Sequence, residues 1–352
     1  MLLLYIHIPF CDSKCFYCSF NSYTDSFHLK ISYEEAICKE LKEKITKFEI
    51  KTFTTVFFGG GTPSSLKSKQ YEKIFEILEP FLDKNTEITF EANPNSATLS
   101  WLSEIKNLGA NRLSFGVQSF DNNKLKYLGR SHNSKTAILA VENARKVGFE
   151  NINCDLLYNC ATDSKELILS DLSIIKSLNI EHLSAYSLTI EEDTKFFEQK
   201  LLQIDDEDFS RFCIENIQKI GFLQYEISNF ARDAKFQSRH NLGYWSGSDY
   251  IGIGAGAVGC IRNKRTKNET SLQKYIDFHS FTEEILGKDE ILMETIFLGL
   301  RSITGVDEKK LDQKSLQNAM FLVNEKKLRF EKGKFFNDDF LLSDELALFI
   351  LR

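Results

Sequence analysis

Three cysteines follow the first apolar run of the chain, in the pattern Cys11-x3-Cys15-x2-Cys18. Three thiolates do not complete the tetrahedral shell of a structural zinc ion, and the nine residues after Cys18 contain no further His or Cys. A [4Fe–4S] cubane held by three thiolates keeps one iron open for another ligand. We therefore expect an open-site [4Fe–4S] cluster. Zinc with a distant fourth ligand and three incidental thiols are the alternatives.

A glycine run and several polar residues follow later apolar runs. Residues 59–63 (GGGTP) come after the second run, where a triple glycine lets the backbone approach a ligand closely and offer it N–H and C=O groups. Glu91, Gln118 and Asp155 end the third, fourth and fifth runs, and Arg130 follows the fourth. A carboxylate can accept hydrogen bonds from hydroxyls, and an arginine can pair with a carboxylate. A plain tight turn, a solvated glutamate and structural salt bridges are the alternatives.

The elements that must position these residues alternate between two periodicities. Short apolar runs predict strands at residues 2–8, 54–58, 87–91, 112–117, 151–157 and 182–188, with a weaker candidate at 224–227. Amphipathic segments predict helices at 32–48, 69–82, 99–108, 135–147, 165–178 and 207–220. Alternation at this spacing predicts βαβ units and a parallel sheet. Six or seven units do not complete an eight-fold barrel, so we expect an incomplete, open one.

The placement of the candidate residues supports this arrangement. The cysteine loop, the glycine run, Glu91, Gln118 and Asp155 all fall at the C-terminal ends of successive predicted strands. Active sites of α/β barrels are built on that rim. We therefore expect one site assembled from these five strand ends.

The pattern changes near residue 233 and divides the chain into three predicted parts. Residues 1–230 form the partial barrel, 231–271 a connecting segment rich in Gly, Tyr and Trp, and 272–352 a small, mainly α C-terminal domain. A short β-like pair is expected at 328–330 and 334–336, with Gly333 at its turn. The predicted fold class is α/β with this smaller helical domain appended.

The bulk composition excludes several classes of protein. A formal net charge of −6 argues against a general nucleic-acid binder, which usually carries a basic excess. No stretch approaches 18 consecutive apolar residues, and the start lacks the basic region of a signal peptide, so we expect a cytoplasmic protein with no transmembrane segment. In that compartment the eight cysteines are not expected to form disulfides.

The cysteine spacing, together with the string YIHIPFC at residues 5–11, resembles the radical S-adenosylmethionine superfamily. Within it, the chain is similar to the group that holds the oxygen-independent coproporphyrinogen III oxidases (HemN) and their HemW relatives. The resemblance runs from Tyr5 to about Gly259. It implies a radical-SAM partial barrel in which Cys11, Cys15 and Cys18 bind the cluster and S-adenosylmethionine chelates the open iron. Reduction of the cluster then cleaves the cofactor to a 5′-deoxyadenosyl radical.

The resemblance also implies the S-adenosylmethionine contacts. The matching positions are Tyr5, Tyr17, Gly60, Gly61, Thr62, Glu91, Gln118, Arg130, Asp155 and Thr189. Gly60, Gly61 and Thr62 are expected at the methionine part. Thr189 replaces a different small residue of the family, so its contact is expected through the backbone. Packed aromatics are the alternative for Tyr5 and Tyr17.

Three features favour the haem-chaperone branch over the oxidases. The oxidases carry a fourth cysteine where this chain has Phe20, and they carry a long N-terminal extension where only four residues precede Tyr5. Residues 240–245 (HNLGYW) match the HNxxYW motif typical of the HemW branch, which makes His240, Asn241, Tyr244 and Trp245 candidate haem contacts. A histidine can ligate haem iron and aromatic rings can stack on a porphyrin. Packing at a domain junction is the alternative.

The sequence therefore predicts a haem chaperone that binds haem as cargo and delivers it to haem-requiring recipient proteins. It would act in the cytoplasm, peripherally at the inner membrane face, with a [4Fe–4S] cluster and S-adenosylmethionine as cofactors. The alternative is an oxygen-independent coproporphyrinogen III oxidase, and a weaker one is a radical methyltransferase or another radical enzyme. The sequence assigns no catalytic residue.

Overall fold

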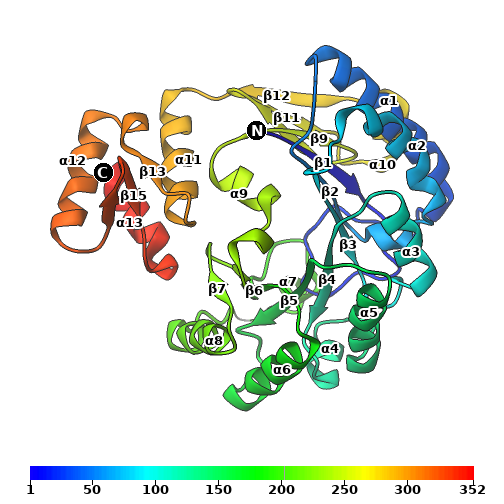
Figure 1. Ribbon diagram of the computed structural model, residues 1–352, viewed down its shortest axis with the longest axis horizontal. Helices are drawn as coiled ribbons and strands as arrows, with labels where there is room; N and C mark the ends of the chain where they lie inside the picture. The colour runs from blue at the N-terminus through cyan, green and yellow to red at the C-terminus, as the bar shows by residue number, and fades with distance from the viewer. Residues whose placement is uncertain (202) are drawn as a thin grey trace.

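One twelve-stranded sheet organises most of the computed structural model, which describes residues 1–201 and 203–352 (Figure 1). Its centre is a run of seven parallel strands in the spatial order β9, β1, β2, β3, β4, β5, β6. Their bounds are β1 (Leu2–Ile8), β2 (Thr55–Gly60), β3 (Glu87–Ala92), β4 (Arg112–Gln118), β5 (Ile152–Tyr158), β6 (His182–Ser187) and β9 (Asp249–Ile253). The predicted incomplete parallel barrel is confirmed, and β9 adds a strand that the sequence pattern did not predict.

The helices between these strands lie on the outside of the sheet, except for α7 (Lys195–Glu198), which packs against the cysteine loop through the Phe196 N–H and the Phe16 carbonyl (Figure 1). They are α1 (Lys30–Lys47), α2 (Lys69–Leu78), α3 (Leu99–Asn107), α4 (Asn122–Tyr127), α5 (Ser134–Lys146), α6 (Lys165–Leu178), α7 (Lys195–Glu198) and α8 (Glu207–Lys219). Several begin where a side-chain oxygen accepts a backbone N–H of the first turn, as Thr98 does for α3, Ser164 for α6 and Asp206 for α8. Such caps satisfy N–H groups that have no partner within the helix.

Alternation along each strand separates two faces of the sheet. Outward residues such as Phe58 and Phe90 are fully buried beneath the helices, and their rings stack with centroids 4.2 Å apart. Inward residues are largely polar and also buried, among them Thr89, Ser114 and Asn153. The outer layer therefore supplies the hydrophobic core, and the barrel interior is free to hold polar groups.

Antiparallel strands extend both edges of the parallel run. They are β8 (Asn229–Ala231) and β7 (Leu223–Gln224) beyond β6, and β10 (Val258–Ile261), β11 (Lys264–Asn268) and β12 (Phe281–Ile285) beyond β9. Of the weak strand predicted at 224–227, only Gln224 lies in a strand, β7, and Glu226 forms an isolated bridge with Ser302. Two helices belong to this region, α9 (Arg239–Trp245) and α10 (Leu272–Phe278).

A second hydrophobic core lies in the C-terminal part. Helices α11 (Lys288–Leu300), α12 (Gln313–Asn324) and α13 (Ser343–Leu351) surround Ile296, Leu300, Phe335 and Leu346. A three-stranded sheet joins them, formed by β13 (Val306–Asp307), β15 (Lys334–Phe336) and β14 (Arg329–Glu331). The predicted β-pair is thus present, and the mainly helical character of this region is confirmed.

Short 3-10 helices complete the described chain: η1 (Phe27–Leu29), η2 (Pro63–Ser65), η3 (Glu79–Phe81), η4 (Ala234–Phe236), η5 (Glu308–Lys310) and η6 (Phe340–Leu342). Within residues 1–201 and 203–352, we find no helix whose length and apolar character would let it cross a bilayer.

The aromatic stack under α2 and α3 predicts a large stability effect. Phe90 is fully buried against Phe58, Tyr71 and Trp101, so Phe90→Ala should lower the free energy of unfolding by about 3–5 kcal/mol. Chemical denaturation followed by circular dichroism measures the change. Phe278→Ala is the control, because that ring is 73% exposed and its loss should cost no more than about 0.5 kcal/mol. Equal losses in the two variants would contradict this packing.

Candidate functional site

The cysteine loop leaves β1 at its carboxyl end and is held at several points. The Cys11 N–H donates to the Tyr23 carbonyl at 3.0 Å, and the Phe16 N–H donates to the Leu128 carbonyl at 3.1 Å. Within the loop, the Cys18 N–H donates to the Cys15 carbonyl at 3.2 Å. These bonds fix the path of the loop over the rim of the barrel.

The three thiols lie in surroundings that suit metal-bound sulfur. An Nη1 of Arg130 donates to the Cys15 Sγ at 3.2 Å, and the Thr62 Oγ1 lies 3.2 Å from the Cys11 Sγ. Burial is the main cause that raises the pKa of the Cys11 and Cys18 thiols, and the nearby Cys15 raises both further. Iron would bind these groups as thiolates, because a coordinated metal displaces the proton.

The donor set is that expected of a cluster with three protein ligands. In the described ranges, no three His, Cys, Asp or Glu side chains converge closely enough to hold one metal ion. A cubane spreads its ligands over several irons and needs no such convergence. Ligation of an iron–sulfur cluster by Cys11, Cys15 and Cys18 stays a prediction.

The glycine run lies directly against the start of the cysteine loop. Gly60 has φ = 110°, and a Cβ at this position would lie 2.4 Å from the His7 ring. At Gly61 a Cβ would lie 2.9 Å from the Ile8 carbonyl oxygen. Both positions therefore exclude larger residues, and the backbone itself is the surface offered to a ligand.

Two carboxyl groups face the barrel interior below this run. The Glu91 Oε2 accepts the Gly60 N–H at 3.1 Å, and the Asp155 Oδ1 accepts the Asn153 amide at 2.7 Å. Burial raises the pKa of Glu91 to about 8, and the charge of Asp155 adds to that rise. Burial likewise raises the pKa of Asp155. The two carboxyl groups can form hydrogen bonds with the hydroxyls or the amine of a bound ligand.

The side chains of Gln118 and Arg130 both approach the backbone of Gly116. A Cβ on Gly116 would lie 3.3 Å from the Gln118 Nε2 and 3.3 Å from the Arg130 Nη2, and Arg130 also donates to the Gly116 carbonyl. Gln118 has φ = 70°, and the pairing of β4 with β5 shifts register just before it. Such a bulge redirects a side chain, and strained backbone of this kind is often found at functional sites.

The two tyrosines predicted at the cofactor both lie by this rim. The Tyr5 ring and the Glu91 carboxylate flank Gly59, and the Tyr5 hydroxyl lies 2.9 Å from the His7 Nδ1. Tyr17 packs on the small apolar cluster beneath the rim. Thr189 follows β6 directly and is exposed. The roles of these residues toward S-adenosylmethionine stay predictions.

His7 is a residue whose role the sequence left open. Its Nε2 lies 2.8 Å from the Asn21 carbonyl oxygen, so the ring connects Tyr5 to the chain just after Cys18. Burial lowers the pKa of His7, which keeps the ring neutral. The signal available in the sequence was its spacing of two from Tyr5, which places both side chains on the interior face.

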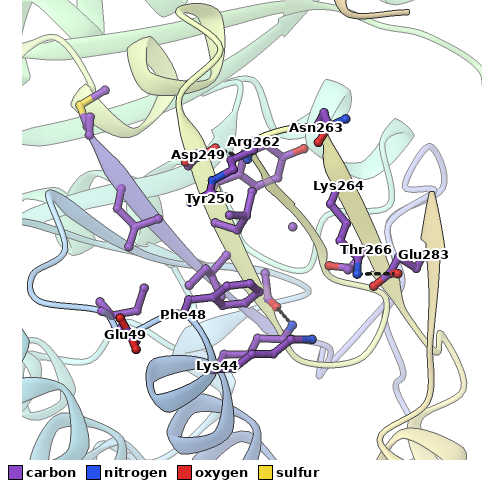
Figure 2. Close-up of a pocket in the computed structure, with 18 of the residues that line it drawn as sticks. Lys44, Phe48, Glu49, Asp249, Tyr250, Arg262, Asn263, Lys264, Thr266 and Glu283 are labelled. Carbon is purple, nitrogen blue, oxygen red and sulfur yellow. Dashed lines mark hydrogen bonds and ion pairs between the residues drawn. The ribbon is translucent and has the colours of Figure 1, made fainter. Parts of the chain in front are cut away.

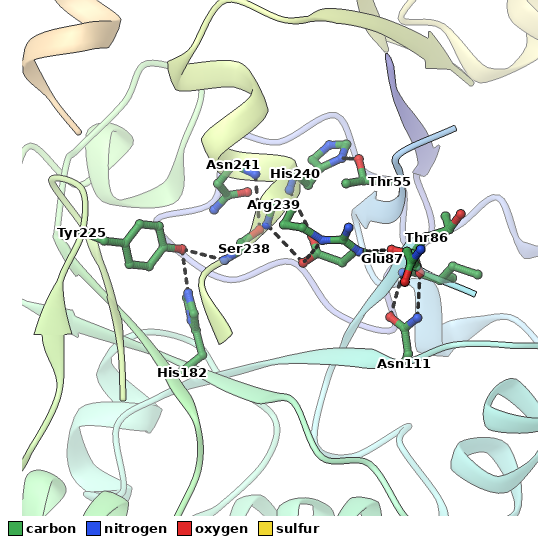
Figure 3. Close-up of polar contacts among 12 residues, drawn as sticks. Thr55, Thr86, Glu87, Asn111, His182, Tyr225, Ser238, Arg239, His240 and Asn241 are labelled. Carbon is green, nitrogen blue, oxygen red and sulfur yellow. Dashed lines mark hydrogen bonds and ion pairs between the residues drawn. The ribbon is translucent and has the colours of Figure 1, made fainter. Parts of the chain in front are cut away.

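The HNLGYW segment lies at the opposite end of the barrel. It forms α9, which packs against β2, β9 and α11. Its first turn is anchored on the amino end of β3, where Glu87 accepts the N–H groups of Arg239 and His240 at 3.1 and 3.0 Å (Figure 3). The His240 Nδ1 lies 2.7 Å from the Thr55 Oγ1 at the start of β2 (Figure 3).

Both ring nitrogens of His240 are occupied in this conformation. The second, Nε2, lies 3.1 Å from the Tyr244 hydroxyl, and the ring stacks on Phe57 with centroids 4.8 Å apart. The side chain is buried, and burial lowers the pKa of His240 to about 3. Haem ligation by His240 stays a prediction, and it would require these contacts to open.

Two cavities lie away from the cysteine rim. One of about 990 Å³ lies between the end of α1 and strands β9 to β12, and Lys44, Phe48, Tyr250 and Lys264 are among its lining residues (Figure 2). The other, of about 790 Å³, lies between α9, the β9–β10 pair and α11. Tyr244 and Trp245 of the HNLGYW segment line the second cavity.

Sequence comparisons relate this chain to one protein superfamily and to one group of proteins within it. Residues 5–164 match the family model of the radical SAM superfamily. The haem chaperone HemW of Bacillus subtilis (strain 168) is 36% identical over 327 residues, which cover 88% of this chain and 86% of that protein. The haem chaperone HemW of Escherichia coli (strain K12) is 37% identical over 266 residues, which cover 74% and 70%.

Among solved structures, the radical SAM enzyme coproporphyrinogen III oxidase (HemN) from Escherichia coli superposes with a TM-score of 0.83. The match covers 99% of this chain and 89% of that one at 20% sequence identity. At this level of identity, the superposition shows a shared fold alone.

The raised pKa of Glu91 predicts a pH-dependent stability of the metal-free protein. Folded Glu91 keeps its proton up to about pH 8, whereas an unfolded glutamate releases it near 4.5. This contribution to the free energy of unfolding is therefore complete below pH 4.5 and is lost as the pH rises to 8, by up to about 1.4 kcal/mol per pH unit. Glu91→Gln should make the decline shallower.

Urea denaturation at several pH values between 5 and 9 measures the slope. Glu72→Gln on α2 is the matched control, because that side chain is exposed. Identical slopes in the wild type and Glu91→Gln would show that Glu91 does not hold its proton in the folded state.

Proposed function

The chain belongs to the HemW family within the radical S-adenosylmethionine superfamily, and we propose that it is a haem chaperone that binds haem and delivers it to haem-requiring proteins. The relationship to the HemW proteins carries this proposal, because it extends over 88% of this chain and most of its relative. Phe20 supports the same conclusion. It is 66% exposed beside the cysteine loop, where the oxidases carry a fourth cysteine.

Different residues of the chain would hold the two cofactors. Cys11, Cys15 and Cys18 would hold the [4Fe–4S] cluster, and the Arg130 guanidinium would offset the negative charge of the thiolates. Backbone groups at Gly60 and Gly61, with the Thr62 side chain, would contact the methionine part of S-adenosylmethionine. Glu91, Gln118 and Asp155 would bind its polar groups from the interior. When bound, the cluster supplies the electron that cleaves this cofactor.

Haem would be cargo rather than a substrate. A protein that carries haem needs an accessible site from which the ligand can leave. In this chain, the cofactor rim is separated from α9 by the length of the barrel strands. We propose recipients that meet the chain at the inner membrane face.

A coproporphyrinogen III oxidase is the second candidate. The specific observation in its favour is that the cysteine loop, the glycine run, Glu91 and Asp155 are all assembled on one rim, as radical chemistry requires. Phe20 argues against it. A radical enzyme acting on another substrate would use the same rim.

The cluster assignment predicts that Cys15→Ser removes iron. The reconstituted wild type should hold about four iron atoms per chain with visible thiolate-to-iron absorption, and the variant should lose most of both. Iron and sulfide analysis after anaerobic reconstitution measures the loss. Cys38→Ser is the control, since Cys38 lies in α1 away from the rim. Iron that stays near four per chain in Cys15→Ser would overturn the ligand set.

The chaperone proposal predicts that the chain retains haem and does not form protoporphyrinogen. Haem added to the reconstituted protein should remain with it through gel filtration and shift the Soret band. In parallel, coproporphyrinogen III with S-adenosylmethionine and a reductant should be left unchanged. No retained haem would contradict the proposal, and efficient protoporphyrinogen formation would establish the oxidase instead.

A further inference from the structure

The cavity of about 790 Å³ beside α9 has the size of a ligand site. Protein pockets for small molecules span about 300–1,000 Å³. This cavity is built where the barrel meets the C-terminal core, because α9 and the β9–β10 pair form one side and α11 the other. Neither the cysteine loop nor the glycine run belongs to its lining.

Aromatic rings form half of the large apolar side chains that line it. Tyr244, Trp245, Tyr250 and Phe297 all line the cavity, and the rings of Tyr244 and Tyr250 meet edge to face with centroids 4.8 Å apart.

The lining also carries an excess of positive charge. It contains four cationic side chains, Arg262, Arg265, Arg301 and Lys310, and two carboxylates, Asp249 and Glu294. One positive charge remains when Asp344, which pairs with Arg301 from outside the lining, is also counted. Arg265 is paired with Glu294 at 2.5 Å, and Arg301 with Asp344 at 2.6 Å. The side chains of Arg262 and Lys310 form no ion pair with any described residue. They are therefore available to an anionic ligand.

Two sulfur atoms line the same space, Cys260 on β10 and Met293 on α11. Cys260 lies opposite Tyr250 in the β9–β10 pair and is only partly buried, so its thiol can be reached from the cavity. Thiolate and thioether sulfur are both known ligands of haem iron. No histidine is present in the lining.

The aromatic rings, the two unpaired cations and the sulfur atoms together match a flat apolar ligand that carries two carboxylates and a metal ion. We propose that this cavity is the site where the chain holds haem, with Cys260 as an iron ligand and with Arg262 and Lys310 binding the two propionates. This assignment rests on the proposed haem-chaperone function and gives it a location.

The same geometry gives His240 a positioning role. With one nitrogen toward Thr55 and the other toward the Tyr244 hydroxyl, His240 holds α9 in place and thereby presents Tyr244 and Trp245 to the cavity. A change at His240 would then alter haem binding indirectly. The HNLGYW segment would serve haem through its aromatic residues.

The larger cavity is a poorer match. Two of its four cations are paired, Lys44 with Glu40 at 2.7 Å and Lys264 with Glu283 at 2.6 Å, and no cysteine lines it. Figure 2 shows the pair of Lys264 with Glu283. Lys44 also donates to the Gly252 carbonyl at 2.7 Å. These contacts tie the end of α1 to β9 and leave fewer charges for a ligand.

The proposed site lies at the amino ends of β1 and β9, whereas the cysteines follow the carboxyl end of β1. Parallel pairing of Leu2 with Asp249 and of Ile6 with Ile253 fixes this opposition. Haem in the cavity would therefore not touch the cluster. Haem affinity should be the same in the wild type and in Cys15→Ser.

The test is a haem titration of the full chain, followed by the Soret band, with iron-free porphyrin as a second probe. Cys260→Ser should shift the Soret band and weaken haem binding about tenfold, and it should leave binding of the iron-free porphyrin unchanged. The double variant Arg262→Gln, Lys310→Gln should weaken both ligands about tenfold, because both carry propionates.

Cys38→Ser and Lys309→Gln are matched controls, and circular dichroism confirms that each variant is folded. Trp245→Phe provides a second variant if Cys260→Ser does not fold, and it should weaken both probes. If the wild type binds haem but these variants bind it with unchanged affinity and spectrum, the cavity assignment is overturned and the chaperone proposal stands. If the wild type binds no haem, both are overturned.

Discussion

The parallel pairing of β1 with β2 on one side and with β9 on the other determines where everything else in this protein can lie. It aligns the carboxyl ends of the strands, so that the cysteine loop and the glycine run emerge next to each other, with the Cys11 Sγ 3.2 Å from the Thr62 Oγ1. It also aligns the amino ends, where α9 rests on Thr55 and Glu87. The barrel thus has two chemically different ends.

The interior between these ends is polar, which is costly unless the groups are paired. His182 shows how the cost is limited: its Nδ1 lies 2.6 Å from the Asn153 Oδ1, and its Nε2 lies 2.7 Å from the Tyr225 hydroxyl. Tyr225 in turn accepts the Ser238 N–H at the start of α9 (Figure 3). Asp155 joins this network through the Asn153 amide, whereas Glu91 accepts the Gly60 N–H at the rim. Burial raises the pKa of both carboxyl groups.

Most of the barrel could be predicted from the sequence, because its strands carry apolar residues on the face that packs under the helices and its helices have strong periodicity. The cluster loop and the rim residues followed from spacing. Strand β9 was not predicted, since Asp249–Ile253 is short and glycine-containing and gains its stability from pairing with β1. The neutral His7 and the buried His240 could not be distinguished from ligands either, because burial and partners depend on tertiary contacts. Cys260 and residues of α11 line the same cavity beside α9, and no local sequence pattern indicates that these segments lie close together.

The proposed carrier role and the oxidase alternative differ in where the porphyrin would bind. An oxidase must bring its porphyrin to the cluster rim, whereas the proposed carrier would hold haem at the opposite end of the barrel. The most direct measurement is the content of iron, sulfide and haem in one anaerobically reconstituted, haem-loaded sample. We expect one haem together with an intact cluster, about five iron atoms per chain in all. Haem that displaces the cluster, or binds only when the cluster is absent, would contradict two separate sites.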